Sequence, residues 1–541
     1  MKKLLILLIL SIFSTSVCFS QWLWSKQIGS NAFYFPYDNV RSLTCDGSYL
    51  YMSGVYGHQL YTQGDTLFCN GNNDIFIMKL DLFGNQIWAK TLGGNFNQPS
   101  AIEDAYMEYD SICNCIYVAG SIIGNVDFGN GINLQASASN ADIFLAKMDL
   151  SGSFLWATTF GGIGDDGTQI FKQPDGHILL AGNLENATII DGNTVNPGGF
   201  LASFDTNGSC MWASHKFSGP EVADLAIDFV GNDIVMGGGY NISNGYIDTV
   251  SLPPAISFDG FITRMDSIGN VKWVTTFGNN GIDAISSLFV DQDKNLYFAG
   301  SFKDSINIFN NSLLSNGQNA LLGKIDENKN PIWVNIMPCT GSYAGGSEIE
   351  ITQNGNLFLA GSFSSTITFD QFNYSTTNSN DMFVSKFDTS GNFIGVQHFG
   401  QASSQEMIIG ANGRPIIAGI FANSITIGNN SYTSYGYNDI FLAQCDDITG
   451  LEEPERFTSN QLIIYANPNI GKCNITVPDE FVNEKYLELT IFDNSGKTVQ
   501  KKILEMNDGV IKVDLEAQAM GVYSITLGNG KKVYSGKMVI E

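Results

Sequence analysis

The sequence predicts an all-β chain: a seven-bladed β-propeller with four strands per blade over residues 21–447, followed by a small C-terminal β-sandwich over residues 461–541. Three observations predict it. Short apolar segments separated by glycine turns repeat seven times, with a period of about 60 residues. One segment of the repeat stands alone before the first complete unit. The repeat ends near residue 447, where the composition changes.

Each repeat unit contains segments that alternate apolar and polar residues with period two, as half-buried strands do. One is an apolar segment that ends in glycine, at 49–54, 115–120, 177–182, 233–238, 295–300, 356–361 and 414–419. The next is flanked by aspartate or another polar residue, at 74–81, 142–149, 198–205, 259–266, 319–326, 381–388 and 439–446. The last begins with tryptophan, at 24–29, 88–94, 156–162, 212–219, 273–278 and 333–338, with Gly395 in place of the tryptophan at 395–400.

The phase of the repeat predicts how the ring closes. The first tryptophan segment, at Trp24, precedes every complete unit, and the last unit has no tryptophan segment of its own. We therefore expect the N-terminal strand to complete the seventh blade, because an open junction would leave two sheet edges unpaired. The spacer Asp-x-x-Gly-x-x-x-Trp, as in Asp81, Gly84 and Trp88, predicts a hairpin turn with glycine at positive φ. The tryptophan is expected to pack between neighbouring blades.

The two ends of the chain carry addressing signals. Residues 1–20 have a basic start, a short apolar run and small residues at their end, so we expect a signal peptide cleaved between Ser20 and Gln21. The apolar run is too short to span a membrane, and no later segment is long enough. Residues 448–460 are polar, contain glycine and proline, and are expected to be a linker.

The repeat units resemble the SBBP β-propeller repeats of secreted bacterial proteins, through the recurrent Asp-x-Phe-x-x-Lys-x-Asp-x-x-Gly-x-x-x-Trp pattern. The C-terminal segment resembles the C-terminal sorting domain of the type IX secretion system of the Bacteroidetes. This second resemblance implies that the secretion machinery recognises the tail and that the protein is released or held on the outer surface of the outer membrane. The residues that carry it are Asn467, Pro468, Gly471, Gly496, Gly521 and Tyr523.

The charge balance limits the partners. The chain has 27 Lys and Arg against 53 Asp and Glu, a net charge of −26, which disfavours nucleic acids and anionic membrane surfaces. One acidic residue per unit follows the tryptophan segment and leads into the innermost strand. We hypothesise that these residues ring one end of a central channel and hold cations, calcium among them. They are Asp38, Asp104, Asp165, Asp224, Asp283, Glu348 and Glu406.

The sequence contains few other candidate catalytic or metal-binding motifs. The four histidines are scattered, and no metalloprotease or nucleophile-elbow motif occurs. Cys113 and Cys115 lack a second cysteine pair for zinc, and alternate residues of a strand face opposite sides, so we expect ordinary buried or paired cysteines rather than a zinc site, with the disulfide pairing left open. We expect no catalytic residues and no cofactor apart from calcium.

These observations favour a monomeric, secreted or surface-bound, non-enzymatic binding or adhesion module that presents loops to a glycan or protein. Two alternatives stay open. One is a secreted glycosidase or lyase, which needs convergent carboxylates in one cleft. The other is a purely structural component of the cell surface.

Overall fold

The computed structural model describes residues 22–448 and 462–540 with internal gaps. Outside the described residues lie 1–21, 32–37, 70–73, 94–100, 103, 137–140, 162–167, 219–221, 242–244, 280, 377–379, 447, 449–461, 466–468, 470, 479–480, 482–483, 494–496, 506–508, 516–517, 530–532 and 541. The chain divides into two compact units, Met1–Gly450 and Leu451–Glu541. The proposed signal peptide, including Ser20 and Gln21, is outside the described residues.

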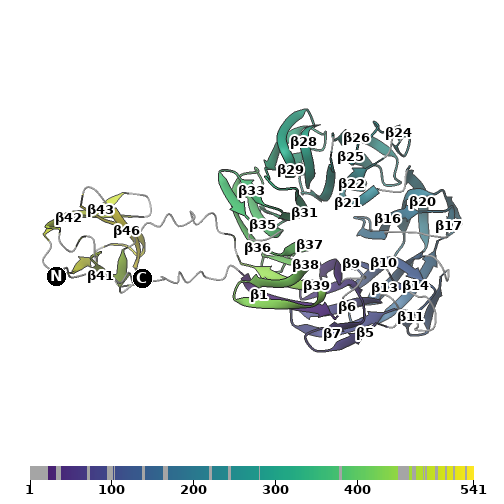
Figure 1. Cartoon of the computed structure of the whole chain (residues 1–541), viewed down its shortest axis with the longest axis horizontal. Coiled ribbons are helices and arrows are strands. Elements are labelled where there is room, and N and C mark those ends of the chain that lie inside the picture. The colour runs from purple at the N-terminus through teal and green to yellow at the C-terminus, as the bar shows by residue number, and fades with distance from the viewer. Residues whose placement is uncertain are drawn as a thin grey trace, which may run out of the picture. The chain divides into compact units, whose positions relative to one another are not determined.

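The first unit is a ring of antiparallel sheets (Figure 1). Within the described residues, seven sheets share one strand order from the centre of the ring outward. These are β2 (Asn39–Cys45), β3 (Tyr49–Tyr56), β6 (Asp74–Asp81) and β7 (Gln86–Leu92); β9 (Tyr106–Asp110), β10 (Cys115–Ile123), β13 (Asp142–Asp149) and β14 (Phe154–Phe160); β15 (Thr168–Lys172), β16 (Ile178–Leu184), β19 (Gly198–Phe204) and β20 (Cys210–Phe217); β21 (Val222–Val230), β22 (Asp233–Tyr240), β25 (Asp259–Met265) and β26 (Val271–Phe277); β27 (Ala284–Val290), β28 (Leu296–Ile308), β29 (Asn311–Ile325) and β30 (Pro331–Met337); β31 (Ala344–Ile351), β32 (Asn356–Phe363), β35 (Asp381–Asp388) and β36 (Phe393–Gly400); β37 (Ala402–Ile409), β38 (Pro415–Ile427), β39 (Asn430–Cys445) and β1 (Trp22–Ser30).

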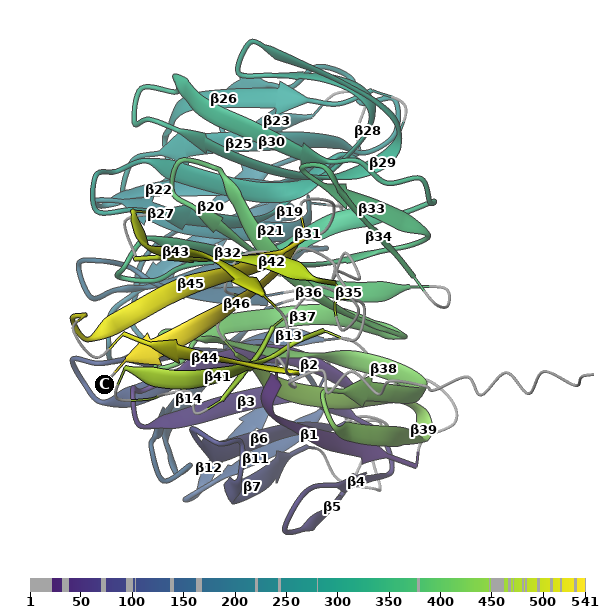
Figure 2. The same ribbon diagram turned by 90° about the vertical axis from the view of Figure 1, so that its left-hand side faces the viewer.

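Short hairpins connect the second and third strands of the sheets. In two sheets the hairpin is a continuation of the strands themselves, β28–β29 and β38–β39, and in Figure 2 these extend toward the same side as β33–β34. The separate short strands are β4 (Gln59–Tyr61), β5 (Thr66–Phe68), β8 (Ala101–Ile102), β11 (Asn125–Gly129), β12 (Ile132–Gln135), β17 (Thr188–Ile190), β18 (Asn193–Val195), β23 (Tyr246–Ile247), β24 (Val250–Ser251), β33 (Thr366–Phe369) and β34 (Phe372–Ser375).

The second and third strands of each sheet form the hydrophobic core. All but the first residue of β3 are buried, and β6 is buried over its first five residues, because a neighbouring sheet covers each face. One core cluster joins Ile77 of β6 to Val118 and Phe144 of the next sheet. Burial on both faces explains why these segments are nearly continuous apolar runs. The core therefore lies between the sheets rather than within any one of them.

The tryptophan of the outer strand packs on the Asp-x-x-Gly turn of the next sheet, as predicted. A Cβ atom placed on Gly84 would lie 2.6 Å from the ring of Trp24, and one on Gly152 would lie 2.9 Å from Trp88. Gly84 has φ of +73°, which confirms the predicted positive φ of this turn. The absence of a side chain at this turn lets the indole ring lie directly against the backbone. Each contact fixes one sheet against its neighbour.

The N-terminal strand closes the ring, which confirms the prediction from the repeat phase. β1 pairs antiparallel with β39, with Gly29 opposite Asp439 and Trp24 opposite Gln444. The indole Nε1 of Trp24 donates a hydrogen bond of 3.2 Å to Gln444 Oε1. One core cluster then combines Ile28 with residues from the first and last sheets. The two ends of the repeat region are thus joined by backbone pairing and by shared apolar burial.

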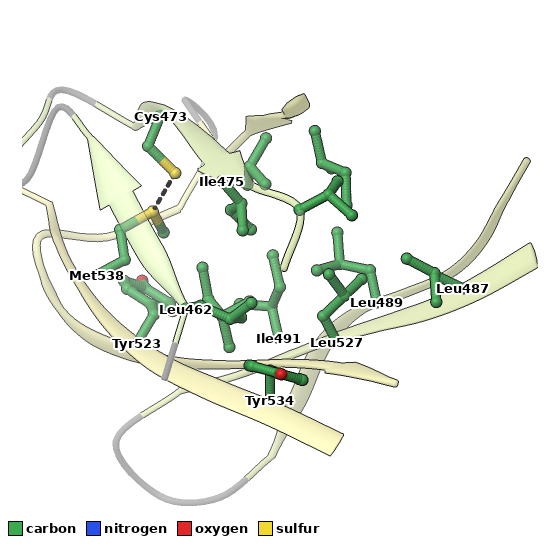
Figure 3. Close-up of a cluster of buried hydrophobic side chains, with 14 of the residues drawn as sticks. Leu462, Cys473, Ile475, Leu487, Leu489, Ile491, Tyr523, Leu527, Tyr534 and Met538 are labelled. Carbon is green, nitrogen blue, oxygen red and sulfur yellow. Dashed lines mark hydrogen bonds between the residues drawn. The ribbon is translucent and has the colours of Figure 1, made fainter. Parts of the chain in front are cut away.

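The C-terminal unit has two antiparallel sheets around its own core. One contains β40 (Ile463–Tyr465), β41 (Lys472–Thr476) and β44 (Val510–Asp514), and the other contains β43 (Thr498–Glu505), β42 (Tyr486–Phe492), β45 (Gly521–Gly528) and β46 (Val533–Ile540). Side chains of both sheets, such as Ile475 and Ile491, meet in one buried cluster (Figure 3). The Tyr523 side chain belongs to this core, and its hydroxyl donates to the Ala519 carbonyl at 2.6 Å.

A pair of glycine substitutions tests the tryptophan contact at the ring closure. Gly84→Ala is expected to destabilise the chain by about 2–4 kcal/mol, because it adds overpacking to the cost of positive φ. Gly47→Ala is the control: its φ is +87°, and nothing lies within 4 Å of the added Cβ. It should cost only about 1–2 kcal/mol. Urea unfolding measures both variants, and equal losses would show that the Trp24 contact contributes nothing.

Candidate functional site

The candidate site is the central cavity of the ring, with a volume of about 730 Å³. It is lined by residues of all the innermost strands, β2, β9, β15, β21, β27, β31 and β37. Each of these strands contacts the innermost strands of its two neighbours, and β37 contacts β2. Hydroxyl groups connect adjacent strands: Ser347 Oγ lies 2.7 Å from Ser404 Oγ, and Ser42 donates to the Met107 carbonyl at 3.0 Å. The wall of the cavity is therefore polar and continuous.

Acidic side chains dominate the charge of this wall. Five carboxylates line the cavity: Glu108, Asp228, Glu348, Glu350 and Glu406. Its two cationic side chains, Arg41 and Lys172, are each paired to an aspartate that is not among the lining residues. Arg41 lies 2.7 Å from Asp104, and Lys172 lies 2.9 Å from Asp110. The negative charge of the cavity is consequently left largely uncompensated.

The carboxylates fall into two layers because strand residues face one side with period two. Glu348 and Glu406 occupy the same register position, opposite Ala360 and Ala418 and just after a bulge in the inner strand. The corresponding residues of the other sheets are Ser42, Tyr106, Gln169, Ala226 and Ser287. Two residues further along lie Glu108, Asp228 and Glu350, with Thr44, Phe171, Phe289 and Ile408 at the same position elsewhere.

Burial and mutual repulsion make these carboxyls weak acids. Burial, followed by the negative charges of Glu348 and Asp228, raises the pKa of Glu350 to about 8. Burial raises the pKa of Glu348 to about 7, although the Ser287 hydroxyl donates to it at 2.8 Å. Burial and the charge of Glu348 hold the pKa of Glu406 well above its usual range. Such groups bind protons or cations near neutral pH.

Two further carboxyls that line the cavity, Glu108 and Asp228, also have raised pKa values. Burial raises the pKa of Glu108 to about 7 against the opposing charge of Lys172, and burial raises the pKa of Asp228 to about 6. Asp228 also accepts the backbone N–H of Val290 in the next sheet at 2.6 Å. The five carboxylates come from β9, β21, β31 and β37, so together they would attract cations into the cavity.

The seven predicted acidic positions are not equivalent, which corrects the expectation of a single ring. Glu348 and Glu406 line the cavity. Asp38 instead accepts the backbone N–H and the hydroxyl of Ser30, and Asp283 accepts the N–H groups of Asn279 and Lys303. Both are fully buried and bind backbone at the start of an inner strand. Asp104 pairs with Arg41. Asp165 and the side chain of Asp224 are outside the described residues.

Three cavity carboxylates were missed by the sequence reasoning: Glu108, Asp228 and Glu350. The spacing Glu348-x-Glu350 was the available signal, since residues two apart on a strand share a face. The sequence did not indicate which face of the innermost strands lines the cavity, because the innermost strand of each sheet has the weakest repeat pattern.

Two cysteines whose pairing the sequence left open are bonded to each other. Cys113 and Cys115 form a disulfide. Only Cys115 belongs to strand β10; Cys113 lies in the preceding turn, so the rule of opposite faces does not apply to this pair. Asp110 lies beside both sulfur atoms.

Those sorting residues that the structure describes make contacts within the C-terminal unit. Gly471 has φ of +91°, its N–H donates to Asn469 Oδ1 at 2.7 Å, and its carbonyl accepts the N–H of Leu515 at 2.7 Å. Gly521 begins β45, and Tyr523 anchors this strand to the preceding turn. Asn467, Pro468 and Gly496 lie outside the described residues.

Comparison with known proteins identifies the tail. Residues 463–541 match the family described as the secretion system C-terminal sorting domain. The protein is therefore exported through the type IX secretion system to the cell surface or the extracellular space. Among the described residues, no helix is long and apolar enough to cross a membrane.

Similarity to curated proteins is distant. The chain is 24% identical over 364 residues to a WD repeat-containing protein, L264, of Acanthamoeba polyphaga mimivirus, covering 50% of this chain and 25% of the relative. It is 24% identical over 221 residues to the regulatory protein FlaEY of Caulobacter vibrioides, covering 38% and 22%. The chain spans about a quarter of the length of these relatives.

Solved structures with related architecture include the Dos1 propeller, with a TM-score of 0.41, 11% identity, and coverage of 80% of this chain and 96% of that one. A protein of unknown function from Dyadobacter fermentans gives a TM-score of 0.33, 9% identity, and coverage of 64% and 94%. The exotype rhamnogalacturonan lyase YesX gives a TM-score of 0.30, 12% identity, and coverage of 92% and 89%. The ring of antiparallel sheets gives the exported protein its propeller fold.

The raised carboxyl pKa values predict an unusual pH profile. The folded chain holds these protons more tightly than the unfolded chain, so the stability they contribute is present below about pH 4 and lost as the pH rises through 6 to 8. Stability should therefore increase on acidification from pH 8 to pH 5.

A second group of aspartates contributes stability that is lost on acidification, but only at lower pH. Hydrogen bonds from Asn85 and Asn270 lower the pKa of Asp81 and Asp266 despite their slight burial, so their contribution is lost below about pH 4. Thermal melting from pH 3.5 to 8.5 measures the profile, and Glu350→Gln should flatten its upper limb. A wild-type stability that falls steadily from pH 8 to pH 5 would contradict the assigned pKa shifts.

Proposed function

We propose that the chain is a secreted or surface-displayed, non-enzymatic binding protein whose central cavity takes up a cation. Its parts are a signal peptide (1–20), a seven-bladed β-propeller (21–447), a linker (448–460) and a C-terminal sorting β-sandwich (461–541). The single observation that carries the proposal is the cavity lined by five carboxylates whose neighbouring cations are already paired elsewhere.

Calcium is the ion that suits this donor set. Hard divalent cations prefer oxygen ligands, and calcium accepts six to eight of them in flexible geometry. Glu348 and Glu350 of β31 and Glu406 of the neighbouring strand β37 would attract the ion with their carboxylates, and Ser287 places a hydroxyl next to Glu348. A bound ion would relieve the repulsion between these carboxylates. It would also give the rigid ring a fixed positive point for an acidic or hydroxyl-rich group on a glycan or protein partner.

The alternative function is a carbohydrate-active enzyme that uses the same cavity. The raised pKa values of Glu348 and Glu350, about 7 and 8, suit a general acid that must hold its proton at neutral pH. A glycosidase also needs a second, ionised carboxylate across the scissile bond, for which Asp228 is the candidate. Binding is preferred because burial, together with the negative charges that act on Glu350 and Glu406, is itself sufficient to account for the shifts.

Calcium titration tests the binding proposal. At pH 7.5 the melting temperature of the full chain should rise with calcium, because an ion at a hundred times its Kd stabilises the folded state by about 2.7 kcal/mol. The double variant Glu348→Gln, Glu350→Gln should lose the rise. Glu327→Gln is the control, because it removes an exposed carboxylate elsewhere in the propeller, and this variant should keep the rise in melting temperature. No shift at about 10 mM calcium, roughly a hundredfold above a 0.1 mM site, would contradict the proposal.

The enzyme alternative makes a different prediction. A panel of aryl glycosides and plant and bacterial polysaccharides should show no hydrolysis or elimination above background if the cavity only binds. Saturable turnover that falls by about 100-fold or more in Glu350→Gln, the usual scale for a lost general acid, would instead establish the enzyme. Turnover unaffected by Glu350→Gln would indicate a contaminating activity and leave the binding assignment in place.

A further inference from the structure

A second cavity, of about 310 Å³, lies on the outer side of the ring between the first two sheets. Its wall is formed by β6 and β7 of one sheet, by the β11–β12 hairpin of the next sheet, and by β13, β14 and the turn that joins them. It contains none of the residues that line the central cavity. Its volume falls at the small end of the range for ligand pockets.

The β11–β12 hairpin borders the cavity without pairing to the neighbouring outer strand. At two other junctions the equivalent hairpin hydrogen-bonds to the outer strand of the preceding sheet. β4 pairs with β1 through Tyr61 and Leu60, and β23 pairs with β20 through Ile247. Among the described residues, β11 and β12 pair only with each other, as β17 and β18 also do. At this junction the space beside the outer strand is therefore bordered by side chains of both sheets.

The hairpin that borders the cavity is held rigidly by local sequence. Asn130 and Gly131 have φ of +55° and +79°, the two positive values of a type I′ turn, for which Asn-Gly is the preferred pair. The Asn130 side-chain Nδ2 donates to the Phe154 carbonyl at 3.0 Å and ties the tip to β14. The Gly129 N–H donates to Asp127 Oδ1 at 2.8 Å and orients that carboxylate. The polar rim is thus formed before any ligand arrives.

The floor and the rim of the cavity differ in chemistry. The floor is apolar and buried, formed by Ile77, Leu92, Phe128, Met148 and Phe154. The rim is polar, formed by Lys90, Thr91, Asp127, Asn130 and Ser153. An apolar floor with a few converging polar groups is the usual composition of a small-molecule site.

The charges and hydrogen-bonding groups of the rim restrict the ligand. Lys90 and Asp127 carry opposite charges, so the rim is neutral overall. Lys90 Nζ donates to the Gly152 carbonyl at 2.7 Å, which leaves two of its three N–H donors for a ligand. Asp127 offers acceptors, and Thr91 and Ser153 offer hydroxyls that act as either. The ligand must therefore combine several hydroxyl-type groups on its edge with an apolar face.

We propose that this cavity, the blade-junction site, binds a neutral saccharide of one or two sugar rings. A pyranose ring presents C–H groups on its faces and hydroxyl groups around its edge, which matches an apolar floor and a polar rim of mixed donors and acceptors. A phosphorylated or strongly anionic ligand does not fit, because Asp127 would repel it. The site makes the exported protein a glycan-binding protein independently of any cation in the central cavity.

Saturation-transfer NMR on the full exported chain tests the site, with a panel of glucose, galactose, mannose, xylose, N-acetylglucosamine and their β-1,4-linked disaccharides. At least one sugar should bind saturably. Lys90→Met and Asp127→Asn should each weaken that binding by about tenfold or more, the usual scale for a lost hydrogen bond to a charged group.

A matched control lies in the neighbouring sheet. Lys26 occupies the same position two residues after a tryptophan and donates to Asn85 of the adjacent turn at 2.8 Å, but it does not line the cavity. Lys26→Met should leave sugar binding unchanged. If Lys90→Met fails to fold, Asp127→Asn on the exposed hairpin decides the matter.

The proposal would be overturned if no sugar binds saturably up to about 50 mM, a concentration above weak millimolar dissociation constants. It would also be overturned if Lys26→Met and Lys90→Met weaken binding equally. The double variant Glu348→Gln, Glu350→Gln should retain full sugar affinity. Loss of affinity there would place the sugar in the central cavity instead.

Discussion

The packing of an outer-strand indole on a side-chain-free turn of the next sheet is the contact on which the ring depends. It recurs around the unit, with Trp24 on Gly84, Trp88 on Gly152, Trp156 on Gly208, and Trp333 on Gly391. At one junction Lys329 replaces the glycine, keeps positive φ at +69°, and places its ammonium group over the Trp273 ring. The ring closes only when the first and last sheets also meet, and at that junction Trp24 of β1 lies on Gly84.

That requirement explains why β1 is taken from the N-terminus. A strand that pairs with β39 while its Trp24 packs on the turn of the first sheet joins the two ends of the repeat in a single element. Separation of the ends would break backbone hydrogen bonds, indole packing and a shared apolar cluster together. The closure is therefore cooperative, and it holds the innermost strands in a fixed circle around the cavity.

A rigid ring of strands can tolerate side chains that lower the stability of the folded state. The cavity carboxylates repel one another and pack against the wall of a partly enclosed space, which raises their pKa values and works against the folded state near neutral pH. The corresponding positions of other sheets carry Ser42, Ala226 or Phe289, so the fold itself does not require acids there. Destabilising charges that the fold does not need are typical of functional positions. The same freedom operates on the outside, where the β11–β12 hairpin borders a second cavity.

The sequence by itself determined the repeat, the strand order within each unit, the turn glycines, the role of the tryptophans and the closing strand. All of these depend on local periodicity or on contacts that recur in every copy, so each copy confirms the others. It also identified the sorting tail from residues close together in the chain. The sites were different. Glu348 and Glu406 were recognised, but Asp38 and Asp283 were grouped with them although both bind backbone. Asp127 and Lys90, which line one cavity from two adjacent sheets, carried no signal at all.

Only the tertiary structure decided which acids face the cavity, that Cys113 and Cys115 pair, and which hairpin borders a second cavity. The physical reason is that each depends on how one particular copy departs from the repeat, through a bulge, a turn or a missing backbone pairing. Repetition predicts what the copies share. The differences that make a site become visible only when all the copies are placed around the same axis.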